Sequence, residues 1–129
     1  MAETVTLLSG ARVVCASCLL ADTVWTRFRG LMGRRELAPG GGLLLRPSGS
    51  VHTCFMRFPI DIVFLDGELE VVAVSPSVRP WRARAKRGAR AVLELPAGEA
   101  VRVGVFRGDR LTVLRREISQ EKEKAYVIA

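Results

Sequence analysis

Apolar residues are grouped along most of the chain in short runs separated by Gly, Pro and Asp, a pattern typical of strands. Residues 4–20 predict one or two strands with a turn at Ser9-Gly10, and Asp66-Gly67 predicts a hairpin between Ile60–Leu65 and Leu69–Val74. Further strands are predicted at 43–45, 51–57, 91–95 and 111–114. The pattern predicts a mainly β fold, a compact antiparallel β-sandwich or barrel-like single domain with one or two short helices.

Helical spacing is found in two segments. Between Thr23 and Met32 the apolar residues share one face, Asp22 or Thr23 can cap the first turn, and Gly33 can end the helix. Residues 115–125 alternate charges at helical spacing and predict an exposed or frayed helix. We therefore expect one β-rich domain over residues 1–114, followed by a C-terminal helical or frayed tail over 115–129.

The length and charge of the chain narrow its class. A chain of 129 residues holds one hydrophobic core and needs no metal or disulfide for stability. The net charge is +7, and all but three of the 20 basic residues are arginines. A GC-rich genome produces the same arginine excess, so the charge by itself identifies no partner. Net charge indicates a tendency to bind non-specifically and does not indicate a function.

Targeting signals and cysteine usage predict a location. The first residues contain no basic and apolar leader, and the longest apolar stretches are too short to cross a bilayer. The chain contains 3 cysteines, an odd number that argues against a disulfide framework. These features predict a cytoplasmic basic protein with reduced thiols and no membrane association.

Cys15-x-x-Cys18 and His52-x-Cys54 together contain the four soft ligands that a tetrahedral zinc site requires. On a regular strand, however, Cys15 and Cys18 point to opposite faces, and their spacing lacks the glycine of a zinc knuckle. A free cysteine is most often a small buried hydrophobe. We expect no metal, no cofactor, and no convergence of the three cysteines.

Asp61 interrupts the apolar run from Ile60 to Leu65, and a buried carboxylate must be hydrogen-bonded or paired. We expect it to be mostly buried and to accept hydrogen bonds from backbone N–H groups or from an arginine. Arg27, Arg34 and Arg57 are the ion-pair candidates. The functional alternative is that Asp61 lines a pocket beside His52 and Arg57.

A basic loop lacks any acidic residue to balance it. No Asp or Glu occurs from Val71 to Leu93, while basic residues surround Trp81 between positions 79 and 90. Our leading hypothesis is a non-catalytic domain that binds a small anionic or polar ligand through six residues: His52, Arg57, Asp61, Arg79, Trp81 and Arg82.

Two other function classes stay open. The first is a hydrolase or transferase that uses His52, Cys54 and Asp61, because His52 and Cys54 would share one face of the predicted strand 51–57. The second is a nucleic-acid-binding accessory protein that uses the basic loop 79–90, although one aromatic residue is few for a stacking platform.

Three sequence blocks resemble the signature blocks of the family called domain of unknown function 192. They are Arg27-x-x-Gly30-Leu31-Met32-Gly33-Arg34, the stretch from His52-Thr53-Cys54-Phe55-Met56-Arg57 to Asp66, and Val92-Leu93-Glu94-Leu95-Pro96-Ala97-Gly98 with Gly108-Asp109-Arg110. The resemblance implies a compact, mostly β single domain and no particular activity. Cys54 stands where the family usually has an aromatic residue.

Overall fold

The structure is a computed structural model that describes residues 3–23 and 31–115. In these ranges it contains nine strands and one short helix. The strands are β1 (Glu3–Ser9), β2 (Arg12–Ala21), β3 (Gly41–Leu45), β4 (Ser50–His52), β5 (Ile60–Leu65), β6 (Val71–Val78), β7 (Ala83–Ala85), β8 (Ala91–Pro96) and β9 (Thr112–Arg115), and the helix is α2 (Glu99–Val103). The mainly β fold predicted from the apolar runs is confirmed.

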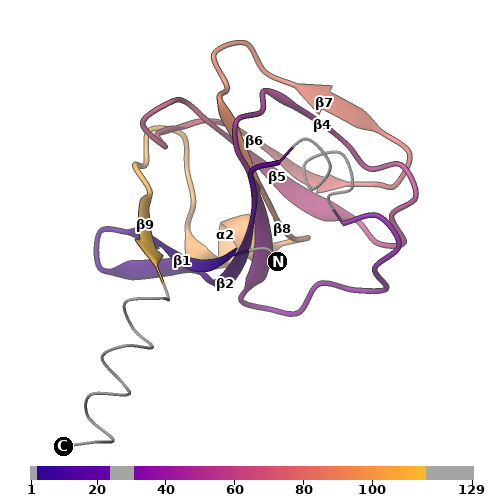
Figure 1. Ribbon diagram of the computed structural model, residues 1–129, viewed down its shortest axis with the longest axis horizontal. Coiled ribbons are helices and arrows are strands. Elements are labelled where there is room, and N and C mark those ends of the chain that lie inside the picture. Colours follow the sequence, from indigo (N-terminus) through magenta and orange to yellow (C-terminus); the bar gives the residue numbers. More distant parts are fainter. Residues whose placement is uncertain (1–2, 24–30, 116–129) are drawn as a thin grey trace, which may run out of the picture.

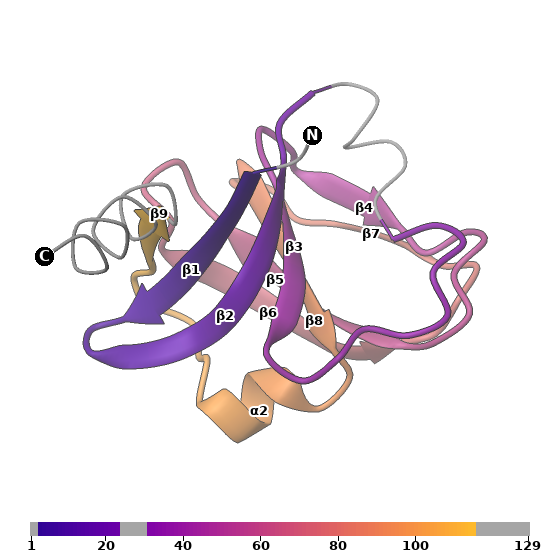
Figure 2. The same ribbon diagram turned by 60° about the horizontal axis from the view of Figure 1, so that its bottom comes forward.

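Seven strands form one strongly curved sheet in the order β6-β5-β8-β3-β2-β1-β9, and β4 pairs with β7 in a small second sheet (Figures 1 and 2). Neighbouring strands are antiparallel, except that β2 and β3 are parallel from Ser17↔Gly41 to Ala21↔Leu45. The large sheet is therefore mixed rather than purely antiparallel.

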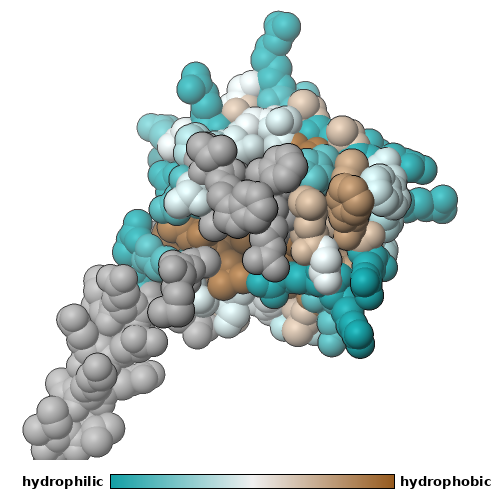
Figure 3. All heavy atoms as spheres, turned by 45° about the vertical axis from the view of Figure 1, so that its right-hand side comes forward, coloured by the Kyte–Doolittle hydropathy of each residue, from teal (hydrophilic) through white to brown (hydrophobic). Residues whose placement is uncertain are grey.

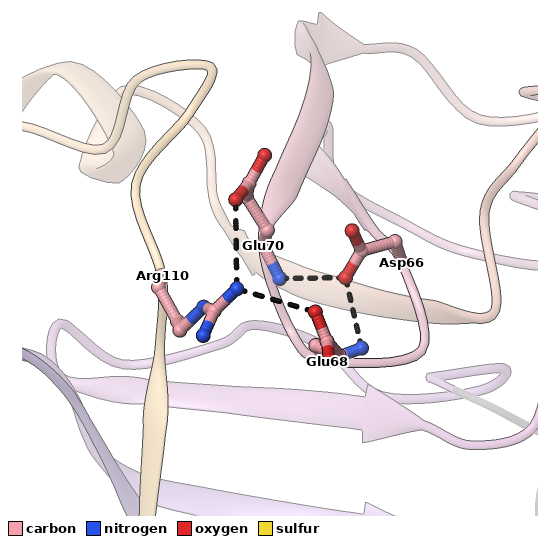
Figure 4. Close-up of polar contacts among 4 residues, drawn as sticks. All are labelled: Asp66, Glu68, Glu70 and Arg110. Atoms are coloured by element: carbon pink, nitrogen blue, oxygen red, sulfur yellow. Dashed lines mark hydrogen bonds and ion pairs between the residues drawn. The ribbon is translucent and has the colours of Figure 1, made fainter.

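The segment that precedes β9 joins the two ends of the large sheet. The Gly108 N–H donates to the Val71 carbonyl (2.8 Å), and the Val71 N–H donates to the Asp109 carbonyl (2.7 Å). Beside these bonds, the Arg110 guanidinium lies 3.2 Å from Glu68 and 3.8 Å from Glu70, next to the Asp66 turn (Figure 4). The sheet thus closes on itself in the barrel-like form of the predicted fold.

Alternating residues of β5 show how the sheet separates two apolar clusters. Val63 and Leu65 belong to the cluster inside the curved sheet, whereas Ile60, Ile62 and Phe64 belong to a second cluster on the outer face. The outer cluster also contains Val51 of β4 and Met56. The small sheet and the loop that follows β4 therefore pack onto the outer face of the large sheet, and their position fixes the candidate site.

Several predicted element bounds were wrong. The strand expected at 51–57 ends at His52, and the basic loop 79–90 contains the whole of β7. Glu99–Val103 forms α2, a helix that the sequence pattern did not reveal. The helix expected at 23–32 and the helical tail expected at 115–125 lie almost entirely outside the described residues.

The described helix has too few residues to cross a bilayer, so the described part of the chain contains no candidate membrane-spanning helix.

Candidate ligand-binding site

Two tight turns, residues 53–56 and 79–82, lie against each other at the end of the small sheet; we call them the paired turns. In the first turn the Met56 N–H donates to the Thr53 carbonyl (3.2 Å), and Phe55 has a φ of 65°. In the second turn Pro80 is followed by Trp81, whose φ is 64°. A proline followed by a residue with positive φ is typical of a type II turn.

The buried side chain of Thr53 holds the paired turns together. Its hydroxyl donates to the Arg79 carbonyl (2.7 Å) and accepts from the Arg82 N–H (2.8 Å), so it is inserted between the two ends of the second turn. The Thr53 N–H also donates to the Arg82 carbonyl (2.8 Å), and the Trp81 N–H donates to the Thr53 carbonyl (3.0 Å). Four hydrogen bonds therefore place the two turns in a fixed relation.

This arrangement places two aromatic rings in contact at the surface. The centroids of the Phe55 and Trp81 rings are 4.7 Å apart, with an angle of 60° between the ring planes. Phe55 is 59% exposed and Trp81 is 58% exposed. A left-handed conformation at a residue other than glycine costs about 1–3 kcal/mol, and such residues cluster at functional sites.

A hollow lies beside the second turn; we call it the arginine hollow. It has a volume of about 510 Å³ and is lined by Val74, Ser75, Pro76, Ser77, Val78, Arg79, Arg82 and Arg84. Three arginines and no carboxylate are among its lining residues. A concave site of this size lined by arginines fits an anionic group, because a guanidinium binds phosphate or carboxylate oxygens with two parallel hydrogen bonds.

Ion pairs are distributed unevenly over the molecule. Arg12, Arg102, Arg110 and Arg115 each pair with a carboxylate, and these pairs lie around β1, β9, α2 and the Asp66 hairpin. Within residues 3–23 and 31–115, no ion pair includes Arg57, Arg79, Arg82 or Arg84. On the face seen in Figure 3, hydrophilic side chains project around apolar surface.

The structure places five of the six residues predicted to bind a ligand in or beside the paired turns. His52 ends β4 directly before the first turn, Arg57 follows that turn, and Arg79, Trp81 and Arg82 form the second turn. Asp61 lies elsewhere, because it is fully buried in the large sheet.

His52 and Cys54 do not lie on one strand face as predicted. The chain leaves the strand at Thr53, because Thr53 bonds to the second turn, and Cys54 lies in the first turn. The His52 Nδ1 accepts a hydrogen bond from the backbone N–H of Cys54 (3.2 Å). This bond orients the imidazole toward the turn backbone.

The Asp61 carboxylate accepts hydrogen bonds from backbone N–H groups, one of the two kinds of donor that we expected. One carboxylate oxygen accepts from the Ser77 N–H (2.8 Å) and the other accepts from the Ala100 N–H of α2 (2.9 Å). Of the arginine candidates, Arg34 and Arg57 are exposed, and Arg27 lies outside the described residues. The carboxylate therefore ties α2 and the end of β6 to β5.

Cys15 and Cys18 share a face, contrary to the prediction for a regular strand. Val5 pairs with Cys18 and Leu7 pairs with Cys15, so Thr6 of β1 opposes both Ala16 and Ser17 of β2, and this β-bulge turns both thiols inward. A hydrogen bond to Cys15, together with burial, holds the pKa of the Cys18 thiol well above its usual range. Cys54 does not join them in a metal-binding cluster: the described residues contain no group of three or more His, Cys, Asp or Glu side chains suited to a metal.

Three residues of interest were missed from the sequence. Glu94 is fully buried in β8, and its Oε1 has no hydrogen-bond partner in the described part of the chain. It interrupts the apolar run Val92–Leu95 as Asp61 interrupts its own run, so the same signal was present. Thr53 and Phe55 gave no such signal, because their roles depend on contacts with residues 79–82.

Comparison with known proteins identifies relatives of this chain. The model of the DUF192 family, described as an uncharacterized ACR, matches residues 5–113. A UPF0127 protein of Pyrococcus furiosus is 39% identical over 98 residues, which cover 70% of this chain and 81% of that protein. A UPF0127 protein of Thermococcus sibiricus is 40% identical over 88 residues, which cover 61% of this chain and only 54% of that protein.

Two crystal structures have the same fold. A protein of unknown function from Novosphingobium aromaticivorans superimposes with a TM-score of 0.74 at 26% identity, covering 86% of this chain and 84% of the other. A putative transcription regulator from Sinorhizobium meliloti superimposes with a TM-score of 0.77 at 28% identity, covering 88% and 94%. The fold and the family match agree, and this chain belongs to the uncharacterised DUF192 (UPF0127) family.

Proposed function

We propose that this protein is a non-catalytic domain that binds an anionic ligand in the arginine hollow. The observation that supports this most directly is that three arginines, Arg79, Arg82 and Arg84, and no carboxylate line a hollow of about 510 Å³. Arg12, Arg102, Arg110 and Arg115 pair with carboxylates, whereas the three arginines around the hollow make no ion pair within residues 3–23 and 31–115, so they are available to an external anion.

The arrangement favours binding over catalysis. The hydrolase or transferase alternative needs His52, Cys54 and Asp61 to act on one substrate. Asp61 is sealed inside the sheet with both oxygens bonded to backbone N–H groups. The His52 Nδ1 accepts the Cys54 backbone N–H, so that nitrogen is not available as a base for the thiol. A nucleophile, a base and an orienting carboxylate are therefore not brought together.

Titration calorimetry with sodium tripolyphosphate tests the proposal. We expect wild-type protein to bind, with an affinity that falls as salt increases. The triple variant Arg79→Ala/Arg82→Ala/Arg84→Ala should bind about tenfold more weakly or worse, because it loses the guanidinium contacts.

The matched control is Arg12→Ala/Arg110→Ala/Arg115→Ala, which removes the same net charge from the closure of the sheet, where each of these arginines pairs with a carboxylate. It should keep wild-type affinity to within about threefold. Equal losses in the two triple variants, or no binding by wild type, would overturn the proposed function.

A further inference from the structure

The arginine hollow does not account for the aromatic pair beside it. Phe55 and Trp81 are not among the residues that line the hollow, and more than half of each side chain is exposed. Both residues have positive φ, which glycine or asparagine adopts at lower cost. Packing within the chain therefore gives little reason for an aromatic residue at either position.

The geometry of the pair leaves ring surface free for a ligand. The two planes meet at 60°, so the rings face different directions instead of covering each other. Thr53 fixes the backbone of both turns, and therefore the positions from which the rings project. A rigid exposed aromatic surface of this kind binds a planar group by stacking.

Positive charge lies immediately around the pair. Arg79 and Arg82 are the first and last residues of the turn that contains Trp81, and Arg57 lies two residues after Phe55. All three are exposed and make no ion pair in residues 3–23 and 31–115. A ligand that uses the whole surface needs a planar ring next to an anionic group.

We propose that the Phe55–Trp81 pair receives an unpaired nucleobase whose phosphate is held by Arg79 and Arg82. The inference rests on the proposed function, because the phosphate is the anion of that proposal. Two kinds of ligand present a base next to a phosphate: a free nucleotide and a single-stranded nucleic acid. An acidic peptide would satisfy the arginines but supplies no obligatory planar ring.

The test compares two strands that differ only in their bases. Fluorescence anisotropy measures the binding of an end-labelled thymidine strand of about twelve nucleotides and of an abasic deoxyribose-phosphate strand of equal length, which has the same charge. We expect wild type to bind the thymidine strand roughly five- to 100-fold more tightly, the range typical of base–aromatic stacking. Trp81→Ala should remove this preference and leave the affinity for the abasic strand unchanged.

Three further variants make the result specific. Phe55→Ala should reduce the preference in the same way, which keeps the test available if Trp81→Ala fails to fold. Trp81→Phe should restore part of the preference, because phenylalanine also stacks. Phe106→Ala removes another aromatic side chain, 63% exposed and lying beside α2, and should leave the binding of both strands unchanged.

Each outcome decides between the claims. If wild type binds both strands equally, the nucleobase site is wrong while the anion site stands; if it binds neither strand nor tripolyphosphate, both are wrong. Equal binding of a glutamate peptide and the thymidine strand would also overturn the nucleobase site. Competition with thymidine monophosphate separates the two sources: displacement at concentrations similar to the strand indicates a free nucleotide, and weak displacement with steep salt dependence indicates a strand.

Discussion

Asp61 and Glu94 each place a carboxyl group inside a buried strand, and their surroundings differ sharply. Asp61 accepts one backbone N–H on each oxygen, whereas the Oε1 of Glu94 has no partner in the described residues. The two residues lie on neighbouring strands and project to opposite faces of the sheet, since Asp61 pairs with Leu95 and Glu94 pairs with Ile62. One carboxyl group therefore joins elements together, and the other is held in an apolar cluster.

We predict that Asp61→Ala lowers the free energy of unfolding by about 2–5 kcal/mol, because two buried N–H groups lose their acceptor. Denaturant unfolding at neutral pH measures the loss. The matched control is Asp66→Ala, which also removes an acceptor of two backbone N–H groups, those of Glu68 and Glu70, at a turn open to water. Its loss should be clearly smaller, and a loss equal to that of Asp61→Ala would contradict this account.

Glu94 should make stability depend on pH. Burial raises the pKa of this carboxyl group from 4.5 in the unfolded chain to about 8 in the folded protein. The folded state therefore binds the proton more tightly, so the contribution of Glu94 is fully present below pH 4.5 and is lost as pH rises toward 8.

We predict a loss of a few kcal/mol of unfolding free energy across that window, and Glu94→Gln should remove most of it, because glutamine cannot ionise. Thermal or denaturant unfolding from pH 5 to about 8.5 provides the measurement. If wild type and Glu94→Gln have parallel pH profiles, Glu94 is not the group responsible.

Among the strands and helices, a single extra residue in β2 determines that the side chains of two cysteines are buried on the same face of the sheet. The bulge between the Cys15 and Cys18 pairings turns both side chains into the inner apolar cluster. The thiol of Cys15 also lies close over Gly42 of β3, where an added Cβ atom would be 2.8 Å from the sulfur. The thiol of Cys15 thus occupies the space that a side chain at position 42 would need.

We predict that only Cys54 reacts readily with a thiol reagent such as dithionitrobenzoate in the native protein. Cys15 and Cys18 are buried, and the raised pKa of Cys18 keeps it in the unreactive thiol form. A native sample should therefore release about one equivalent of thionitrobenzoate quickly, and the Cys54→Ser variant almost none. Rapid release of three equivalents without denaturant would show that the bulge region is open.

The apolar runs were sufficient to predict most strands but not the contacts that shape the site. Ile60–Leu65 and Ala91–Pro96 are mostly apolar, each interrupted by one carboxylate, so the existence and type of both strands followed from the sequence. The bulge at Cys15–Cys18 depends on the register with β1, and the end of β4 depends on hydrogen bonds between Thr53 and a turn 26 residues away. Such long-range pairings leave no periodic pattern in the sequence.

In the whole molecule, the arginines at the closure of the sheet differ from those at the paired turns in whether they pair with carboxylates. Around the closure, Arg110 pairs with Glu68 and Glu70, and Arg12 pairs with Asp109 (Figure 4). Around the paired turns, the arginines have no carboxylate partner in the described residues. The sequence predicted the basic loop, while the contrast with the neutralised closure required the three-dimensional arrangement.

Titration of ¹⁵N-labelled protein with tripolyphosphate, followed by two-dimensional NMR, tests the anion site most directly, because it locates the ligand without any substitution. We predict that the backbone signals of Ser77, Arg79, Arg82 and Arg84 move progressively, while those of residues 108–111 at the closure stay fixed. Shifts centred on the closure or on α2, or no shifts at ligand concentrations that saturate calorimetric binding, would contradict the claim that the arginine hollow binds an anion.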